Sequence, residues 1–362
     1  MTDSNDHAAA SPIHFTPESL ANEFRQVGAK LGAAAETFAK MDEVHYGATE
    51  REEIWRDGKV VLYRFKGDKP SRSKVPLLIS YALVNRPYMV DLQSDKSIVR
   101  GLLERGEDIY VIDWGYADRS DRYLELQDYI VRYLGGAVDA LRERSGQDRI
   151  NLLGICQGGV FSLCYTSLFP HKIRNLITMV TPVDFHTRDN MLSNWTRGVD
   201  ADLLVNAVGN VSADMMNFTY LTLKPWRLFV QKYVGMVDIL DNPRAMEDFL
   251  RMEKWIFDSP DQAGEAFREF TTEFFQGNGL VNGTATVGGQ SIDLMRVQCP
   301  VYNIYAEQDH LVPPEASKAL GGLIGSEDYS EMSFRGGHIG IYVSSRAQRD
   351  VPENIHQWLA AH

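Results

Sequence analysis

The chain alternates between short apolar runs and longer segments in which apolar residues recur at helical spacing. Runs of strand length and β-type composition lie at Lys59–Phe65, Val75–Leu83, Asp108–Trp114, Ile150–Ile155, Asn175–Val183, Pro300–Tyr305 and Tyr329–Phe334. Helical patterns follow or separate them at about Ser94–Arg105, Leu124–Arg144, Val160–Leu168 and Arg346–Ala361. Strands that alternate with helices at this pace are typical of a mostly parallel sheet with helices on both faces, so the pattern predicts an α/β fold.

The middle of the chain departs from this alternation. From Thr187 to Leu294 the sequence is mainly helical and rich in aromatic residues and methionine, which predicts an inserted cap. The predicted division is an N-terminal helical segment 1–58, a first core part 59–186, the cap 187–294 and a second core part 295–362. Within the first segment, residues of helix-start type begin at Thr16, and an amphipathic pattern continues to about Met41. That helix either packs on its own domain or docks against another subunit.

The most informative stretch for chemistry is the motif Gly154-Ile-Cys156-Gln-Gly-Gly159. It joins a strand-type run to a helical one, as in a nucleophile elbow, where flanking glycines let the backbone crowd together and one side chain points outward. Here that side chain is the thiol of Cys156. A small buried cysteine that only packs is the alternative, and the turn favours the nucleophile.

Two later residues complete the order nucleophile, acid, histidine that the α/β-hydrolase layout requires. Asp309 follows the run that ends at Tyr305, and His338 lies in a glycine-flanked turn before the last helix. A turn-capping aspartate and a surface histidine are the alternatives, but the order and context of all three residues favour a triad. His310 directly follows Asp309 in the chain. It either contacts the catalytic residues without reacting itself or has only a structural role.

The chemistry of a thiol nucleophile assigns the expected roles. Cys156 attacks as the thiolate, His338 is its base, and Asp309 orients the imidazole and stabilises its protonated form. An oxyanion needs two N–H donors, for which we expect the backbone N–H groups of Gln157 and Val84. The sequence offers no metal site, because its three cysteines lack paired spacings. We expect Cys164 and Cys299 to be packing residues.

Composition narrows the class of protein. The chain has 362 residues, 44% of them hydrophobic, and contains no apolar run near the ~20 residues of a membrane span. We therefore predict no transmembrane segment. The start, Met1–Pro12, has no basic or apolar signal region, so we expect a cytoplasmic location. A net charge of -12 argues against nucleic acid as a partner.

The chain resembles the polyhydroxyalkanoate (PHA) synthases, and in particular the class III catalytic subunit, over nearly all residues beyond about Phe15. Four stretches carry the resemblance: Gly154–Gly159, Leu83–Leu92, Phe257–Arg268 and Asp309–Pro314. The short length of the chain also suits the class IV PHA synthases. The resemblance implies an acyltransferase that polymerises (R)-3-hydroxyacyl-CoA, such as 3-hydroxybutyryl-CoA, with coenzyme A as the leaving group and no cofactor. It further implies a second subunit of the PhaE type, a homodimer or higher oligomer, and association with the growing polyester chain and granule.

Two other classes compete with the synthase hypothesis. A cysteine hydrolase of the same fold, such as a dienelactone hydrolase-like enzyme, a thioesterase or a polyester depolymerase, would need the same triad. It differs in using water as the acceptor in place of an alcohol. A non-catalytic binding module on this fold is the third class, and such modules usually lose a triad member.

Overall fold

The computed structural model describes residues 46–223, 235–236, 238–240 and 242–362. The chain forms two compact units, and the larger comprises His45–Pro225 and Arg251–His362. The described residues of the other unit lie between Gly235 and Leu250. The helix expected over Thr16–Met41 lies outside the described residues.

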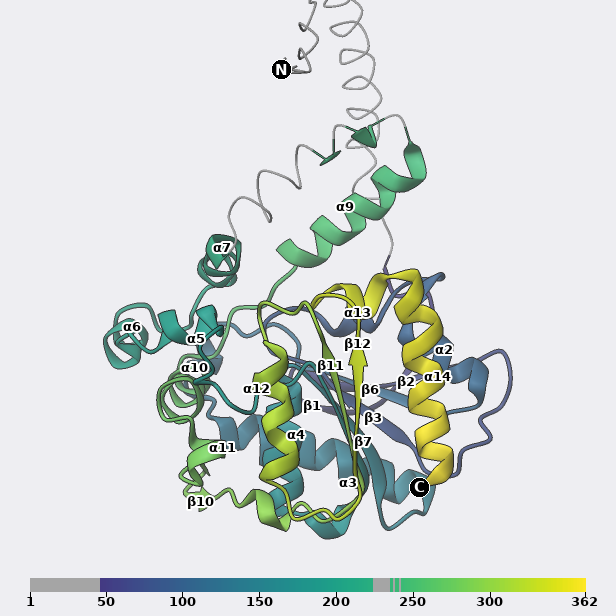
Figure 1. Cartoon of the computed structure of the whole chain (residues 1–362), viewed down its shortest axis with the longest axis horizontal. Helices are drawn as coiled ribbons and strands as arrows, with labels where there is room; N and C mark the ends of the chain where they lie inside the picture. The colour runs from purple at the N-terminus through teal and green to yellow at the C-terminus, as the bar shows by residue number, and fades with distance from the viewer. Residues whose placement is uncertain (1–45, 224–234, 237, 241) are drawn as a thin grey trace, which may run out of the picture. The chain divides into compact units, whose positions relative to one another are not determined.

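An eight-stranded sheet in the order β1-β2-β6-β3-β7-β8-β11-β12 forms the centre of the larger unit (Figure 1). The strands are β1 (Arg51–Asp57), β2 (Val60–Phe65), β3 (Leu77–Ser80), β6 (Ile109–Asp113), β7 (Ile150–Ile155), β8 (Ile173–Met179), β11 (Val301–Ala306) and β12 (Tyr329–Phe334). From β6 to β12 every neighbouring pair is parallel, whereas β2 pairs antiparallel with both β1 and β6. The predicted mostly parallel sheet is confirmed.

Apolar side chains alternate between the two faces of this sheet. Leu78 and Leu152 belong to one buried cluster, while their neighbours Ile79 and Leu153 belong to another. Since successive side chains of a strand point to opposite faces, each central strand contributes to both clusters. This double burial explains why these strands are continuous apolar runs in the sequence.

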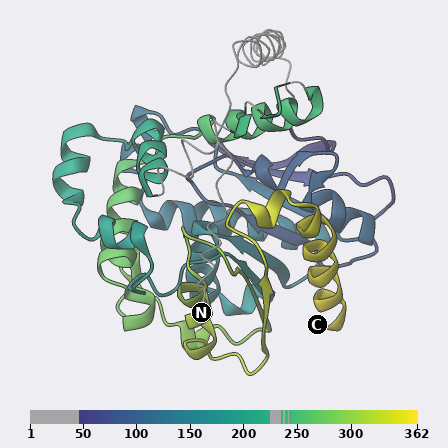
Figure 2. The same cartoon turned by 45° about the horizontal axis from the view of Figure 1, so that its top comes forward.

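Helices cover both faces of the sheet. The core helices and helical turns are α2 (Ile98–Arg105), η4 (Asp128–Leu134), α3 (Gly135–Ser145), α4 (Gln157–Leu168), α12 (Pro314–Lys318), α13 (Gly340–Val343) and α14 (Ser345–Ala361). Helices α2 and α14 lie side by side and supply the cluster of Ile79, whereas α3 and α4 supply the cluster of Leu78 (Figures 1 and 2). The sheet therefore has a buried core on each side, and α4 leaves it at the predicted elbow.

Strand β1 corrects the expectation of a wholly helical segment over 1–58. It pairs with β2 through the turn at Gly58, whose φ is +59°. Its residues Ile54 and Trp55 pack against the cluster on the α3 side. Five of the seven residues from Arg51 to Asp57 are charged, which hides this strand in the sequence, because an edge strand with one buried face needs few apolar positions.

The insertion between β8 and β11 is mainly helical within the described residues. Its elements are α5 (Met191–Thr196), α6 (Ala201–Val208), α7 (Ala213–Leu223), α9 (Pro243–Phe257), α10 (Gly264–Phe270), η7 (Thr271–Gln276) and α11 (Gly279–Asn282). Phe270 and Phe274 belong to the cluster on the α3 side, and the Phe270 ring lies 6.1 Å from that of Phe161 on α4. The later part of the insertion is thus built into the core and is not only a cover.

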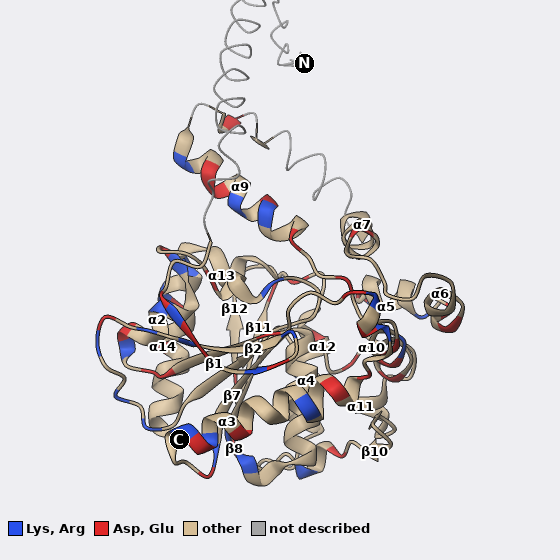
Figure 3. Ribbon diagram, turned by 180° about the vertical axis from the view of Figure 1, so that it is seen from behind, with Lys and Arg blue, Asp and Glu red and all other residues tan. Residues whose placement is uncertain are grey.

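Helix α9 carries residues of both charges (Figure 3). Its residues up to Leu250 belong to the smaller unit and those from Arg251 to the larger. In the smaller unit, Leu240, Met246 and Leu250 form a separate buried cluster. Among the described residues, none of the helices is long and apolar enough to cross a membrane.

Candidate active site

Cys156 occupies the sharp turn between β7 and α4. Its backbone has φ +53° and ψ −122°, and its N–H donates to the carbonyl of Met179 at 2.9 Å. A positive φ is uncommon outside glycine and costs about 1–3 kcal/mol, which the surrounding structure must offset. The hydrogen bond to β8 and the helix that starts at Gln157 supply that constraint, so the thiol is held at the end of the sheet.

Two glycines make the tight turn possible. A Cβ atom on Gly158 would lie 2.2 Å from the carbonyl oxygen of Ser80, at the end of β3. A Cβ on Gly154 would lie 2.5 Å from the Cα of Gly159. No side chain fits at such distances, because they lie far inside van der Waals contact, and the motif therefore requires glycine here.

His338 and Asp309 meet beside this turn although each lies on a different loop. Asp309 follows β11, His338 follows β12, and the His338 Nδ1 lies 2.6 Å from the Asp309 Oδ2. The other oxygen of Asp309 accepts the backbone N–H groups of Leu311 and Val312 at 2.8 and 2.9 Å. Both carboxylate oxygens therefore have donors, and the loop itself orients the carboxylate.

The electrostatic surroundings of His338 favour its protonated form. Burial disfavours the charge, but the Asp309 carboxylate and the Cys156 sulfur outweigh burial and raise the pKa of His338 to about 10. The Cys156 sulfur lies close enough to the imidazole to contribute to this shift. The structure thus brings the three side chains together in the spatial order carboxylate, imidazole, thiol.

Three tyrosines that the sequence did not single out surround the sulfur. Burial, followed by the charge of Cys156, raises the pKa of Tyr81, directly after β3, and of Tyr220, on α7. The ring of Tyr342 lies 6.3 Å from that of His338 and 6.4 Å from that of Tyr81. All three hydroxyls stay protonated at neutral pH. Only their tertiary placement reveals them, since no motif in the sequence marks a tyrosine at these positions.

The side chain of Gln157 has a role that the sequence did not indicate. Its Oε1 accepts the backbone N–H of Leu83 at 3.0 Å, and both residues are buried. Val84, the expected second oxyanion donor, is the next residue of that loop. The loop is held further by Trp114, whose Nε1 donates to the carbonyl of Tyr81 at 2.9 Å. The two backbone groups expected to bind an oxyanion are thus linked through Gln157.

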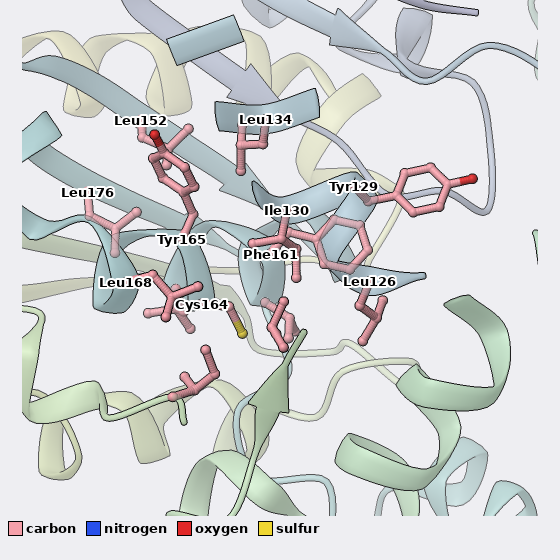
Figure 4. Close-up of a cluster of buried hydrophobic side chains, with 14 of the residues drawn as sticks. Leu126, Tyr129, Ile130, Leu134, Leu152, Phe161, Cys164, Tyr165, Leu168 and Leu176 are labelled. Carbon is pink, nitrogen blue, oxygen red and sulfur yellow. The ribbon is translucent and has the colours of Figure 1, made fainter. Parts of the chain in front are cut away.

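The remaining candidates from the sequence are His310 and the two other cysteines. His310 is partly buried and neighbours Asp309 in the chain, and its role stays a prediction. Cys164 is fully buried among Phe161, Tyr165 and Leu168 (Figure 4). Burial raises the pKa of its thiol, and it raises that of Cys299 to about 12. Neither thiol is favoured as a thiolate, which is consistent with packing roles.

Comparison with known proteins identifies the fold and the family of this chain. The family described as alpha/beta hydrolase fold matches residues 76–344. The fold is shared with an alpha/beta hydrolase fold protein from Chitinophaga pinensis, which is 13% identical with a TM-score of 0.51 over 87% of this chain and 99% of that chain. A metagenome-derived lipolytic enzyme is 13% identical with a TM-score of 0.50, over 81% and 96%.

Sequence relatives are much closer than these structures. The poly(3-hydroxyalkanoate) polymerase subunit PhaC of Allochromatium vinosum is 54% identical over 96% of this chain and 99% of the relative. The subunits of the same name from Thiocystis violacea and Synechocystis are 53% and 49% identical, over 96% and 88% of this chain and 98% and 86% of the relatives. These identities confirm the family that the motifs indicated: the chain belongs to the poly(3-hydroxyalkanoate) polymerase subunit PhaC family, within the alpha/beta hydrolase fold.

Proposed function

We propose that the chain polymerises (R)-3-hydroxyacyl-CoA, such as 3-hydroxybutyryl-CoA, into polyester through an acyl-thioester on Cys156. The observation that carries the proposal is the 2.6 Å contact of His338 with Asp309 beside the Cys156 elbow. A protonated imidazole next to the sulfur favours the thiolate, which is the reactive form. Membership of the PhaC family supports the acyl acceptor being an alcohol.

In the acylation step, the Cys156 thiolate attacks the carbonyl carbon of the acyl-CoA. The new carbon–sulfur bond forms as the bond to the sulfur of coenzyme A breaks, and the imidazolium of His338 gives its proton to the departing thiolate. The backbone N–H groups of Gln157 and Val84 bind the oxyanion between these events. No cofactor is needed, because a thioester is exchanged for a thioester of similar energy.

In the elongation step, the 3-hydroxyl of a second monomer or chain end attacks the acyl group on Cys156. Its proton passes to neutral His338, an oxoester bond forms, and the Cys156 sulfur leaves as thiolate. Asp309 is the competing acceptor for that proton. The imidazole is neutral at this point because it gave its proton to coenzyme A, and acylation has also removed the charge of the sulfur, one of the groups that raise the pKa of His338.

A hydrolase of the same fold would use the same three residues with water as acceptor. The two are separated by incubating the full chain with (R)-3-hydroxybutyryl-CoA and measuring free coenzyme A, free 3-hydroxybutyrate and turbidity together. Polymerisation gives coenzyme A and insoluble polymer with little free acid. Coenzyme A with an equal amount of free 3-hydroxybutyrate and no polymer would establish the hydrolase instead.

We also propose that a PhaE-type subunit binds this chain and that the assembly works at the granule surface, with the catalytic chain itself forming a homodimer or higher oligomer. The insertion carries apolar residues that are candidates for the partner surface: Phe218 on α7 is 67% exposed, whereas Met215 and Met216 are half-buried. Met236 packs on the cluster of the smaller unit, and Trp226 and Phe229 lie outside the described residues. Because contiguous exposed apolar surface marks partner sites, Phe218 is the residue through which we test this proposal.

The partner proposal is tested by the time course of polymerisation. The isolated chain is expected to polymerise slowly after a lag, and titration of the second subunit is expected to shorten that lag. Phe218→Ser should weaken this response, while Tyr123→Ser, at an equally exposed position (71%), should leave it unchanged. Full-rate polymerisation without a lag, unaffected by the second subunit, would rule out the dependence.

A further inference from the structure

The loop after β3 is tied to the segment that leads out of α9. Asn85 Nδ2 donates to Ser259 Oγ at 2.5 Å, and Trp255 Nε1 donates to the carbonyl of Arg86 at 2.9 Å. Tyr88 Oη donates to Asp258 Oδ2 at 2.9 Å. Three contacts therefore join the loop to Trp255–Ser259, which comprises the end of α9 and the two residues that follow it.

Asp258 is the centre of this connection. Its second oxygen accepts Tyr116 Oη at 2.5 Å, so one carboxylate binds tyrosines from two different loops. Burial and the adjacent Asp258 raise the pKa of Tyr88 and of Tyr116, which keeps both hydroxyls protonated as donors. Tyr88 is only 5% exposed, so its hydroxyl would find little water as a substitute for the carboxylate.

Arg86 links the same loop to strand β6. Its Nη2 donates to Asp113 Oδ2 at 2.7 Å, and its guanidinium lies 4.2 Å from the centre of the Tyr116 ring. The Tyr116 ring is therefore held on one side by Arg86 and at its hydroxyl by Asp258. A displacement of the loop would therefore disturb the contacts of Tyr116 with both Arg86 and Asp258.

Val84 lies between two tethered residues of this loop. On one side, the N–H of Leu83 is bound by Gln157, and on the other, the side chain of Asn85 is bound by Ser259. An oxyanion donor must lie within about 2.7–3.1 Å of the developing charge. A misplacement of about 1 Å can lower the rate on the order of 100-fold. The position of the Val84 N–H therefore depends on both tethers.

We infer that Asp258 is a positioning residue for acyl transfer: through Tyr88 and Tyr116 it holds the loop that presents the Val84 N–H to the oxyanion. The inference rests on the proposed acyl transfer to Cys156. Asp258 does not touch the thiol or the imidazole in this role, so its loss should impair the step that forms an oxyanion and spare the nucleophile.

Two reactions of the same sulfur separate these effects. Single-turnover release of coenzyme A from (R)-3-hydroxybutyryl-CoA passes through an oxyanion, whereas alkylation of Cys156 by iodoacetamide, followed by peptide mass spectrometry, does not. In Asp258→Ala we expect acylation to fall about 10- to 100-fold, with alkylation within about twofold of wild type. Asp139→Ala is the matched control and should change neither rate. It removes an aspartate of α3 whose carboxylate pairs with Lys172 and with Arg142.

A conservative variant distinguishes positioning from general damage. In Asp258→Asn the amide oxygen still accepts from Tyr88 while the amide N–H donates to the Tyr116 hydroxyl, so acylation should recover to within about threefold of wild type. Should Asp258→Ala fail to fold, the double variant Tyr88→Phe/Tyr116→Phe removes the same contacts with the rings retained and should show the same split.

The inference is overturned by either of two results. Acylation that is unchanged in Asp258→Ala and in the double variant would show that the contacts position nothing. Acylation and alkylation that fall in parallel would show a structural role. A wild-type chain that releases no coenzyme A would instead refute the proposed function, which keeps the two failures distinct.

Discussion

The side-chain oxygen of Gln157 accepts the backbone N–H of Leu83, so the residue directly after the nucleophile holds the loop on which the second oxyanion donor lies. One residue thereby contributes to both halves of the expected oxyanion site. Its own N–H begins α4 beside Cys156, and its amide fixes the neighbour of Val84. The side chain of residue 157 should therefore matter for acyl transfer as much as its backbone N–H does.

Replacing Gln157 tests this link. Gln157→Met keeps the volume of the side chain but leaves the buried Leu83 N–H without an acceptor, which costs about 1–3 kcal/mol of unfolding free energy. Single-turnover acylation should fall about 10- to 100-fold through misplacement of the loop. Gln290→Met, at an exposed position on β10 (Gln290–Ser291), is the control and should behave as wild type. An unchanged acylation rate in Gln157→Met would contradict the link.

Removing the nucleophile should abolish acyl transfer and reveal the strain of the elbow. We expect Cys156→Ala to lower the rate of coenzyme A release by on the order of 10⁶-fold. Cys156→Gly should be equally inactive but about 1 kcal/mol more stable than Cys156→Ala, because glycine adopts a positive φ without steric cost. Coenzyme A release and denaturant titration measure the two effects.

The other two cysteines provide the controls for this assignment. Cys164→Ala and Cys299→Ala should retain wild-type rates of coenzyme A release, since neither thiol lies in the elbow. Turnover by Cys156→Ala, or an acyl group found on Cys164 by peptide mass spectrometry, would overturn the assignment of the nucleophile.

The loss of His338 should be more severe than the loss of Asp309. His338→Gln removes the group that exchanges protons in both steps, and should block acylation. Asp309→Asn leaves an imidazole that is less well oriented, so some acylation should persist while elongation slows. Rapid-quench measurement of acyl-enzyme and polymer resolves the two steps. Faster acylation in His338→Gln than in Asp309→Asn would reverse these roles.

The raised pKa of His338 predicts how stability depends on pH. The folded-state pKa of about 10 exceeds the ordinary value of 6.5, so the folded protein binds this proton more tightly than the unfolded chain does. The resulting stabilisation is fully present below pH 6.5 and is lost as the pH rises through about 10. Denaturant titrations from pH 6 to 10 should therefore show a steeper loss in wild type than in His338→Gln.

Asp309→Asn sharpens the same prediction, because the Asp309 carboxylate contributes most to raising the pKa of His338. The variant should lose its His338-dependent stabilisation at a lower pH than wild type does. Nuclear magnetic resonance of the His338 ring would report the pKa directly. An imidazole that is already neutral at pH 8 in wild type would disprove the ion-pair description of the resting site.

Local sequence patterns were sufficient for much of the fold. Continuous apolar runs marked the central strands because both faces of a parallel sheet are buried, and Tyr329–Phe334 is a strand over the predicted range. The pattern failed at Arg51–Asp57, where a strand at the edge of the sheet carries charges on its open face. It also did not indicate that Phe270, within the predicted cap, packs into the core.

The candidate site divides in the same way. The elbow at Cys156 and the order in which Asp309 and His338 follow could be predicted from the sequence, because each is marked by a strand end or a glycine turn next to it in the chain. That Gln157 binds Leu83, 74 residues away, and that Tyr88 binds Asp258, 170 residues away, became visible in the folded chain alone. Such contacts depend on how distant segments pack, and a hydrogen-bonding side chain carries no local sign of the partner that it will meet.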